Sequence, residues 1–252
     1  MVYTSLGPAW FETYGIIFEI IFILITGLIA LRSYRAYKLI KKKELLTFTL
    51  SFGLFCLAFF TQFIINLLIV LNKQSKDHLL SPLNTLNTVI TSNFQLSSMC
   101  YFFFSLFTIC GLLLFIYLTF EIRNRRLLLL LFVLVVLAQI TAINKIVLFY
   151  VFSTIFYGFI VEFYYRKKIK VAFLGFVFLL ISNISFLFIP LSEFAFVIGN
   201  FLTLVGYLIL AKLLKKTVYL HANALAPIER KNKLVLLENL RFWEGEKKGS
   251  LS

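Results

Sequence analysis

Seven long apolar runs constrain the fold of this chain more than any other feature of its sequence. Each run approaches the length of about 20 residues that an α-helix needs to cross roughly 30 Å of hydrocarbon. The runs are Tyr14–Leu31, Leu45–Leu71, Ser98–Phe120, Leu127–Ile143, Ile146–Tyr165, Val171–Pro190 and Glu193–Leu213. With 61% hydrophobic and only 14% charged residues, the chain has too little polar surface to bury these runs in water.

The fold class follows from the hydrogen-bonding needs of the backbone in lipid. Only helices and closed barrels satisfy every peptide group there, and the runs lack the alternation of polar and apolar residues that is typical of barrel strands. The sequence therefore predicts an all-α integral membrane protein. We expect a seven-transmembrane-helix bundle over residues 1–216 and a basic amphipathic tail over residues 217–252, in a multi-pass protein of the cell membrane.

The orientation is predicted from the distribution of Lys and Arg. Of the 25 basic residues, 22 lie in the first, third and fifth connections or from Lys212 onward, and the other side of the predicted bundle has only Lys73, Lys76 and Lys145. Short loops rich in Lys and Arg stay in the cytoplasm. We therefore expect the N-terminus outside and the C-terminus inside. The same placement explains the net charge of +14 by contact with anionic lipid, so no nucleic-acid partner is expected.

Two sequence similarities indicate an internal repeat. The segments 27–35 (GLIALRSYR) and 158–166 (GFIVEFYYR) share Gly, Ile, Tyr and Arg at equal offsets, and 108–113 and 203–208 share T-x-x-G-x-L. Spans one to three then repeat as spans five to seven in the same orientation, with the fourth as a linker. Chance similarity between apolar helices is the alternative.

Polar side chains within the spans are the candidate ligand-binding residues, because polar groups are costly in the bilayer. Once the helices are oriented, these side chains fall between mid-depth and the outer face, whereas the inner half is mostly apolar. We predict an outward-facing polar cavity above a closed inner half. Its candidate residues are Glu19, Gln62, Asn66, Gln139, Asn183 and Asn200. Glu19 is interpreted as a counter-charge for a cationic or hydrogen-bonding ligand, or alternatively as a carboxyl that simply bonds Asn66 or Asn200.

Catalysis is not expected from this sequence. The two histidines, His78 and His221, fall in a loop and in the tail, and the one aspartate, Asp77, is also in a loop. Neither a histidine pair for haem nor an H-E-x-x-H metal site is present, and the serines of the spans have no histidine or lysine base nearby in the sequence. We expect no enzyme activity, no cofactor and no metal.

The loops and the tail are candidate contact surfaces. The longest outer connection, Asn72–Ser97, is polar and of a length to cover the cavity. In the tail, Leu234, Leu237, Leu240 and Trp243 recur at every third residue beside basic neighbours. This spacing predicts a helix on the inner leaflet, or alternatively a docking helix for a cytosolic protein.

The stretch ALRSYRAYKLIKKKE (30–44), the seven spans and the outside N-terminus together resemble the seven-helix membrane domains that precede kinases and cyclases in prokaryotic sensors. The resemblance implies a sensor, although the tail is too short to hold a kinase or cyclase domain. We therefore predict an orphan, receptor-like protein that binds a small molecule and signals through a cytoplasmic partner. The alternatives are a small-solute transporter and a non-catalytic scaffold subunit.

Overall fold

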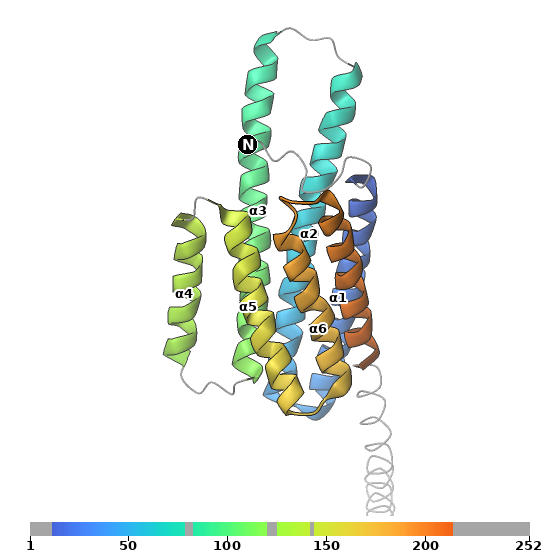
Figure 1. Ribbon diagram of the computed structural model, residues 1–252, viewed down its shortest axis with the longest axis vertical. Helices are drawn as coiled ribbons and strands as arrows, with labels where there is room; N and C mark the ends of the chain where they lie inside the picture. The colour runs from blue at the N-terminus through green and yellow to red at the C-terminus, as the bar shows by residue number, and fades with distance from the viewer. Residues whose placement is uncertain (1–11, 79–82, 120–124, 142–143, 214–252) are drawn as a thin grey trace, which may run out of the picture. The chain divides into compact units, whose positions relative to one another are not determined.

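Seven helices make up almost all of the chain that the computed structural model describes, residues 12–78, 83–119, 125–141 and 144–213, and no strand occurs among these residues. Figure 1 labels six of them, and we call the seventh the last helix. The helices are α1 Glu12–Ile40, α2 Lys43–His78, α3 Leu83–Thr119, α4 Arg125–Thr141, α5 Lys145–Arg166, α6 Lys170–Leu187 and the last helix Glu193–Leu213. The prediction of an all-helical protein is confirmed.

Local signals explain several of the helix ends. The side chain of Asn144 caps α5 by accepting a hydrogen bond from the backbone N–H of Val147 at 3.3 Å. Pro190 lies just beyond the end of α6, as is common after a helix C-terminus. The turns after α1 and α5 each contain one lysine in the left-handed region, Lys41 with φ 56° and Lys168 with φ 55°.

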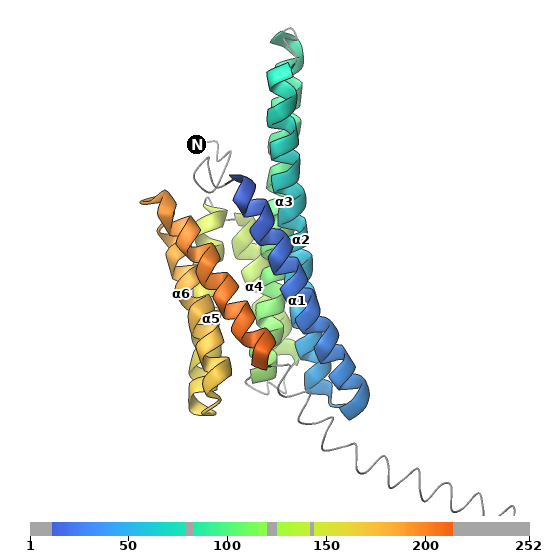
Figure 2. The same ribbon diagram turned by 90° about the vertical axis from the view of Figure 1, so that its right-hand side faces the viewer.

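Three helices are longer than the apolar runs that predicted them. Helix α1 continues nine residues past Leu31, so Arg32, Arg35 and Lys38 extend a helix rather than form a connection. The predicted connection Asn72–Ser97 is also mainly helical, because α2 reaches His78 and α3 begins at Leu83. Figure 2 shows these two helices extending past the others at one end. Polar residues can prolong a helix beyond the hydrocarbon, and a hydropathy pattern does not detect them.

Six helices are long and apolar enough to cross a membrane, and the protein is therefore a multi-pass membrane protein. The exception is α4, which has 17 residues. Helix α1 illustrates the two faces of a membrane helix: Leu24 and Leu31 are 60% and 59% exposed, whereas Phe22 and Ile29 are buried. Such rows of exposed apolar side chains are stable against lipid and not against water.

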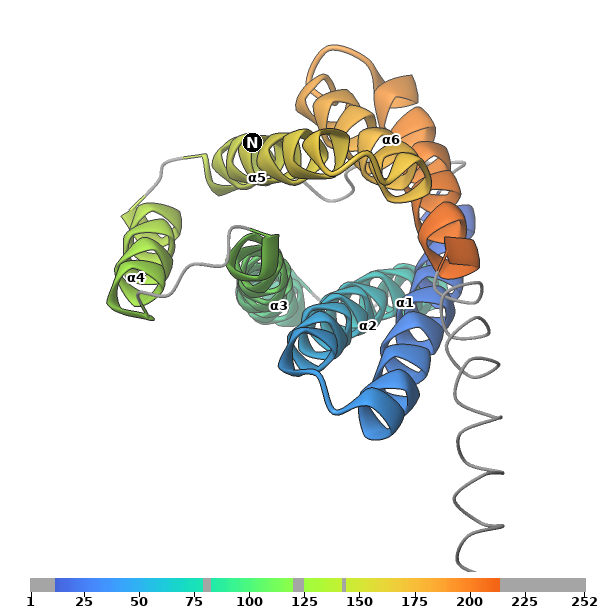
Figure 3. The same ribbon diagram turned by 90° about the horizontal axis from the view of Figure 1, so that it is seen from below.

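The six long helices form a closed ring in the order α1, α2, α3, α5, α6 and last helix, with α4 outside it (Figure 3). Helix α4 packs against α3 and α5. The last helix completes the ring by contacting α1, where Phe18 and Phe201 meet with ring centroids 5.0 Å apart, and α6, where Ser182 bonds Thr203. The ring thus consists of two sequential triplets, α1–α3 and α5 to the last helix.

Small residues bring α6 and the last helix into close contact. A Cβ atom on Gly206 would lie 3.0 Å from the carbonyl oxygen of Gly175, and a Cβ on Gly175 would lie 3.3 Å from that of Gly206. The hydroxyl of Ser182 also donates to the carbonyl of Gly199 at 2.8 Å. Close backbone approach at small residues, together with hydrogen bonds between helices, is the usual way in which helices associate in lipid.

Most basic residues of the described part of the chain gather at one end of the ring, which we call the basic end, whereas Lys73 and Lys76 lie near the far end of α2. It holds the turn between α1 and α2, Lys41–Lys43, and the turn between α5 and α6, Arg166–Lys170 (Figure 1). Lys145, at the start of α5, lies at the opposite end. The predicted tail helix lies outside the described residues.

Candidate functional site

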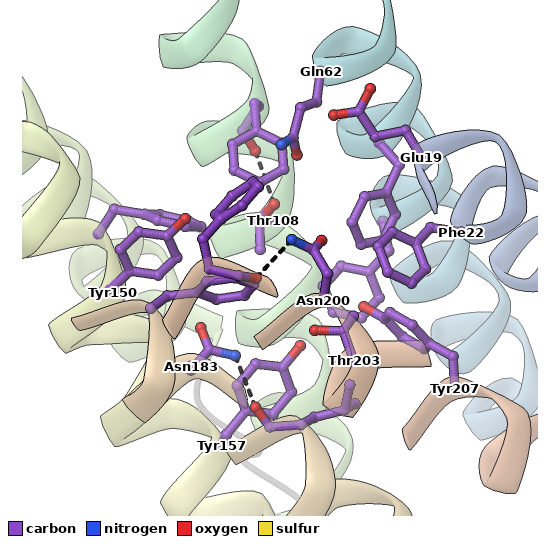
Figure 4. Close-up of a pocket in the computed structure, with 17 residues that line it drawn as sticks. Glu19, Phe22, Gln62, Thr108, Tyr150, Tyr157, Asn183, Asn200, Thr203 and Tyr207 are labelled. Atoms are coloured by element: carbon purple, nitrogen blue, oxygen red, sulfur yellow. Dashed lines mark hydrogen bonds between the residues drawn. The ribbon is translucent and has the colours of Figure 1, made fainter. Parts of the chain in front are cut away.

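A pocket lies inside the ring of six helices and receives side chains from every one of them. Its cavity volume is about 60 Å³, and the space between its lining atoms, which includes space open to solvent, is about 650 Å³. Figure 4 shows its polar groups, which come from both helix triplets. The lining residues are Glu19 and Phe22 of α1, Phe55, Phe59 and Gln62 of α2, Phe104 and Thr108 of α3, Phe149, Tyr150 and Tyr157 of α5, Leu179, Asn183 and Phe186 of α6, and Phe196, Asn200, Thr203 and Tyr207 of the last helix. No residue of α4 is among them.

Glu19 carries the only carboxyl group among the described lining residues, which include no lysine, arginine or histidine, and it is 4% exposed. Its Oε1 accepts a hydrogen bond from Nδ2 of Asn66, which lies on α2. Its Oε2 is buried and has no hydrogen-bond partner among the described residues. A buried carboxyl oxygen without a partner is costly, so this atom is suited to receive a donor or a positive charge from a ligand.

The amide side chains differ in how they are bonded. Asn183 donates to the carbonyl of Leu179 at 2.9 Å, and Asn200 donates to that of Phe196 at 2.9 Å, so each amide nitrogen bonds the preceding turn of its own helix. Gln62 lies one helical turn before Asn66 on α2, and the two therefore share a face of that helix. These bonds fix the amides of α6 and the last helix at the wall of the pocket, as Figure 4 shows.

The structure brings together most of the residues predicted from the sequence. Glu19, Gln62, Asn183 and Asn200 line one pocket, and Asn66 stands behind Glu19 as its hydrogen-bond donor. Gln139 is not part of this group. It lies on α4, outside the ring, where it is buried and its Nε2 lacks a hydrogen-bond partner among the described residues.

Aromatic side chains close the pocket toward the basic end. We call this set the aromatic layer: Phe22, Phe52, Phe115, Tyr157, Phe176 and Tyr207, one from each helix of the ring. Their rings touch in sequence. Tyr207 meets Phe22 at 6.1 Å and Phe52 at 6.4 Å. The series continues from Phe52 to Phe115 at 5.3 Å, from Phe115 to Phe176 at 5.5 Å and from Phe176 to Tyr157 at 6.5 Å.

The hydroxyl groups on the basic side of this layer are bonded to the backbone. Thr26 donates to the carbonyl of Phe22 at 2.6 Å, Ser51 donates to Thr47 at 3.0 Å, and Thr119 donates to Ile116 at 3.0 Å. Ser33 reaches across to the carbonyl of Leu45 at 3.3 Å. Because these hydroxyl groups already donate to backbone carbonyls, they have no free donor for a ligand.

The aromatic wall of the pocket and its two threonines, Thr108 and Thr203, were not among the predicted site residues. Thr108 and Thr203 line the pocket, and each opens one T-x-x-G-x-L segment. The glycines of these segments mark close helix contacts. A Cβ on Gly111 would lie 3.1 Å from the carbonyl oxygen of Ser51 on α2, and a Cβ on Gly206 would lie similarly close to the backbone of α6. The shared motif was thus a usable signal. The tyrosines of the pocket could not be singled out from the sequence, because aromatic residues occur throughout the spans.

Comparisons with protein-family models, with curated proteins and with solved structures find no match to this chain.

Proposed function

We propose that the protein is a receptor-like multi-pass protein of the cell membrane, which binds a small molecule in the pocket and signals through a cytoplasmic partner. The observation that carries the proposal is the unpartnered Oε2 of Glu19 inside a pocket built by all six helices of the ring. The lining groups provide recognition, and among the described ones we find no nucleophile paired with a base.

Closure at one end favours a receptor over an open passage. The aromatic layer joins all six helices of the ring below the pocket, and Phe52, Phe115 and Phe176 are at most 1% exposed. A ligand that enters from the opposite end would stop at this layer. Its binding would then change helix packing, which the basic turns can present to a partner in the cytoplasm.

The same proposal includes seven membrane crossings. Helices α3 and α5 pack against each other and run in the same direction in Figure 1, so the chain must return across the same depth between them. Helix α4 lies on that return path, and its 17 residues cover about 25 Å at 1.5 Å per residue. Leu129, Leu130 and Leu137 are more than half exposed, as expected for a helix in lipid.

The proposed orientation puts the basic end in the cytoplasm. The turns Lys41–Lys43 and Arg166–Lys170 are both at this end, and loops rich in Lys and Arg remain on the cytoplasmic side. The pocket then opens toward the outside, because Glu19 lies near the start of α1 and Asn200 near the start of the last helix.

A 3+1+3 parallel repeat is the proposed origin of the ring. Two features support it: Thr108 with Gly111 and Thr203 with Gly206 have corresponding places in the third helix of each triplet, and Lys41 and Lys168 adopt the same left-handed turn after the first helix. The segments 27–35 and 158–166 add no support, because a Cβ atom added at Gly158 would meet no described atom within 4 Å, and one added at Gly27 would meet only Sγ of Cys56 at 3.6 Å.

A small-solute transporter is the second candidate, favoured by the position of the pocket between two three-helix units. Transporters with internal repeats bind substrates at such an interface. In that case the aromatic layer would be a gate that opens in a second conformation. A scaffold subunit, the third alternative from the sequence, leaves the free Glu19 oxygen unexplained.

The test combines ligand screening with a flux assay on the purified full chain. A small-molecule library is screened by thermal shift against the wild type and Glu19→Gln, and each hit is then tested for uptake into proteoliposomes. The receptor proposal expects hits that depend on Glu19 and do not cross the bilayer. Uptake of a hit would favour the transporter, and a screen without a hit that depends on Glu19 would contradict ligand binding in this pocket.

A further inference from the structure

The charge of the pocket is one-sided. Its described lining residues include a single carboxyl group, Glu19, and neither lysine, arginine nor histidine. The hydrogen bond from Asn66 satisfies one oxygen, and the other remains without a partner. When this carboxyl is ionised, its negative charge has no basic side chain in the described lining to balance it. A positively charged ligand would supply the missing charge.

Aromatic rings line the same pocket as the carboxyl of Glu19. Phe22 follows Glu19 by three residues on α1 and therefore lies on the same face of that helix. Phe22, Phe59 and Tyr207 form a three-ring cluster, with centroid distances of 5.0 Å, 6.1 Å and 5.8 Å between the pairs. All three rings line the pocket. Ring faces attract cations, most strongly where water is excluded.

Phe104 and Phe149 continue this aromatic wall from the first triplet to the second. Phe104 of α3 meets Phe59 at 6.5 Å and Phe149 of α5 at 5.5 Å, so the rings extend from the carboxyl across to the opposite helices. A lining of this kind favours a charge carried on an apolar body. It disfavours a strongly hydrated ion such as sodium, which requires several oxygen ligands at once.

We propose that the pocket binds a small organic ammonium ion, with its positive charge between the Glu19 carboxylate and the rings of Phe22, Phe59 and Tyr207. This inference rests on the proposed function and names its ligand class. The carboxylate supplies the counter-charge, the rings contact the alkyl groups on nitrogen, and the amides of Asn183 and Asn200 lie at the wall reached by the rest of the ligand.

Choline and its neutral isostere 3,3-dimethylbutan-1-ol are the probes, because they have the same shape and differ in charge. The purified full chain in lipid nanodiscs is titrated with each probe, and binding is followed by calorimetry and by thermal shift. We expect choline to bind at least about tenfold more tightly than the alcohol, which corresponds to roughly 1.4 kcal/mol. We also expect Glu19→Gln to remove this preference, because the glutamine oxygen can still accept from Asn66 while the charge is lost.

Two further variants separate a binding role from a folding role. Glu162→Gln removes an exposed carboxyl that pairs with Arg166 outside the pocket, and choline binding should be unchanged. Phe22→Leu keeps an apolar side chain but removes a ring, and choline binding should weaken several-fold while binding of the alcohol changes little.

The outcomes distinguish the inference from the proposed function. Equal binding of the two probes would overturn the ammonium inference and leave a ligand pocket in place. If neither probe binds but the library screen yields a neutral hit that depends on Glu19, the inference also fails and the proposed function stands. If no compound binds in a way that depends on Glu19, both are overturned.

Discussion

Asn66 of α2 donates a hydrogen bond to Oε1 of Glu19 on α1, and this bond joins two residues 47 positions apart in the chain at the pocket wall. The pair satisfies Oε1 of the carboxyl and leaves Oε2 buried without a hydrogen-bond partner among the described residues. It also connects the first two helices of a triplet by polar groups inside the bundle, where neighbouring contacts are mostly apolar.

Breaking this pair should lower stability. Asn66→Leu leaves both oxygens of Glu19 without the amide donor, and polar contacts between membrane helices are worth about 0.6 to 2 kcal/mol. We expect a loss of about 1 kcal/mol in the free energy of unfolding, measured by denaturant titration in mixed micelles. The double variant Glu19→Leu/Asn66→Leu should recover most of it. Additive losses in the two single variants and the double variant would contradict the coupling.

The contact between α6 and the last helix should be sensitive to a single methyl group. In Gly206→Ala the new Cβ would lie 2.8 Å from the Leu179 side chain and 3.0 Å from the Gly175 carbonyl, so the two helices must separate. We expect a loss of about 1 to 3 kcal/mol. Gly158→Ala is the matched control, because no described atom lies within 4 Å of its added Cβ. It should be neutral or slightly stabilising, and equal losses at both positions would argue against close helix contact.

The left-handed lysine after α5 should be replaceable by glycine with a gain in stability. Lys168 has φ 55°, a conformation that costs a non-glycine residue about 1 to 2 kcal/mol. Lys168→Gly should raise the apparent Tm, although the more flexible unfolded chain offsets part of the gain. Lys167→Gly removes the same charge at φ −76° and should lower the Tm. An equal response of the two variants would indicate an effect of charge rather than of backbone conformation.

The proposed orientation predicts which turns face the cytoplasm. Single cysteines at Lys168 and Lys145 lie at opposite ends of α5. In intact cells, a membrane-impermeant maleimide should label Lys145→Cys and not Lys168→Cys, and both should react after the membrane is opened. The unsubstituted chain controls for the native cysteines, of which Cys56 and Cys110 are half-buried within helices. The reverse labelling pattern would show that the orientation of the bundle in the membrane is opposite to the proposed one.

The sequence predicted the helices well where the apolar pattern alone determines them. The runs Ile146–Tyr165 and Val171–Pro190 match α5 and α6 closely, because polar turn residues bound both runs. The ends of α1, α2 and α3 were wrong, since their polar extensions carry no hydropathy signal. The pattern also could not decide how the ring closes, because contacts such as Phe18 with Phe201 join residues far apart in the chain.

The site was predictable in its polar members and not in its boundaries. Glu19, Asn183 and Asn200 share one pocket, as their similar predicted depth indicated. Gln139 has a comparable depth but belongs to α4, and depth alone cannot tell a helix inside the ring from one outside it. The aromatic wall was hidden by composition: with 31 phenylalanines in the chain, no single ring stood out.

The aromatic layer has a mechanical consequence for the whole ring of helices. Phe22 belongs to the layer and also lies within one turn of Glu19, so a shift of α1 at the pocket moves a ring that abuts Tyr207. From Tyr207 the neighbouring rings extend through Phe52 and Phe115 to Phe176 without a gap in the series. Because tightly packed interiors transmit strain, we expect a displacement of α1 beside Glu19 to require adjustments in the neighbouring helices of the ring.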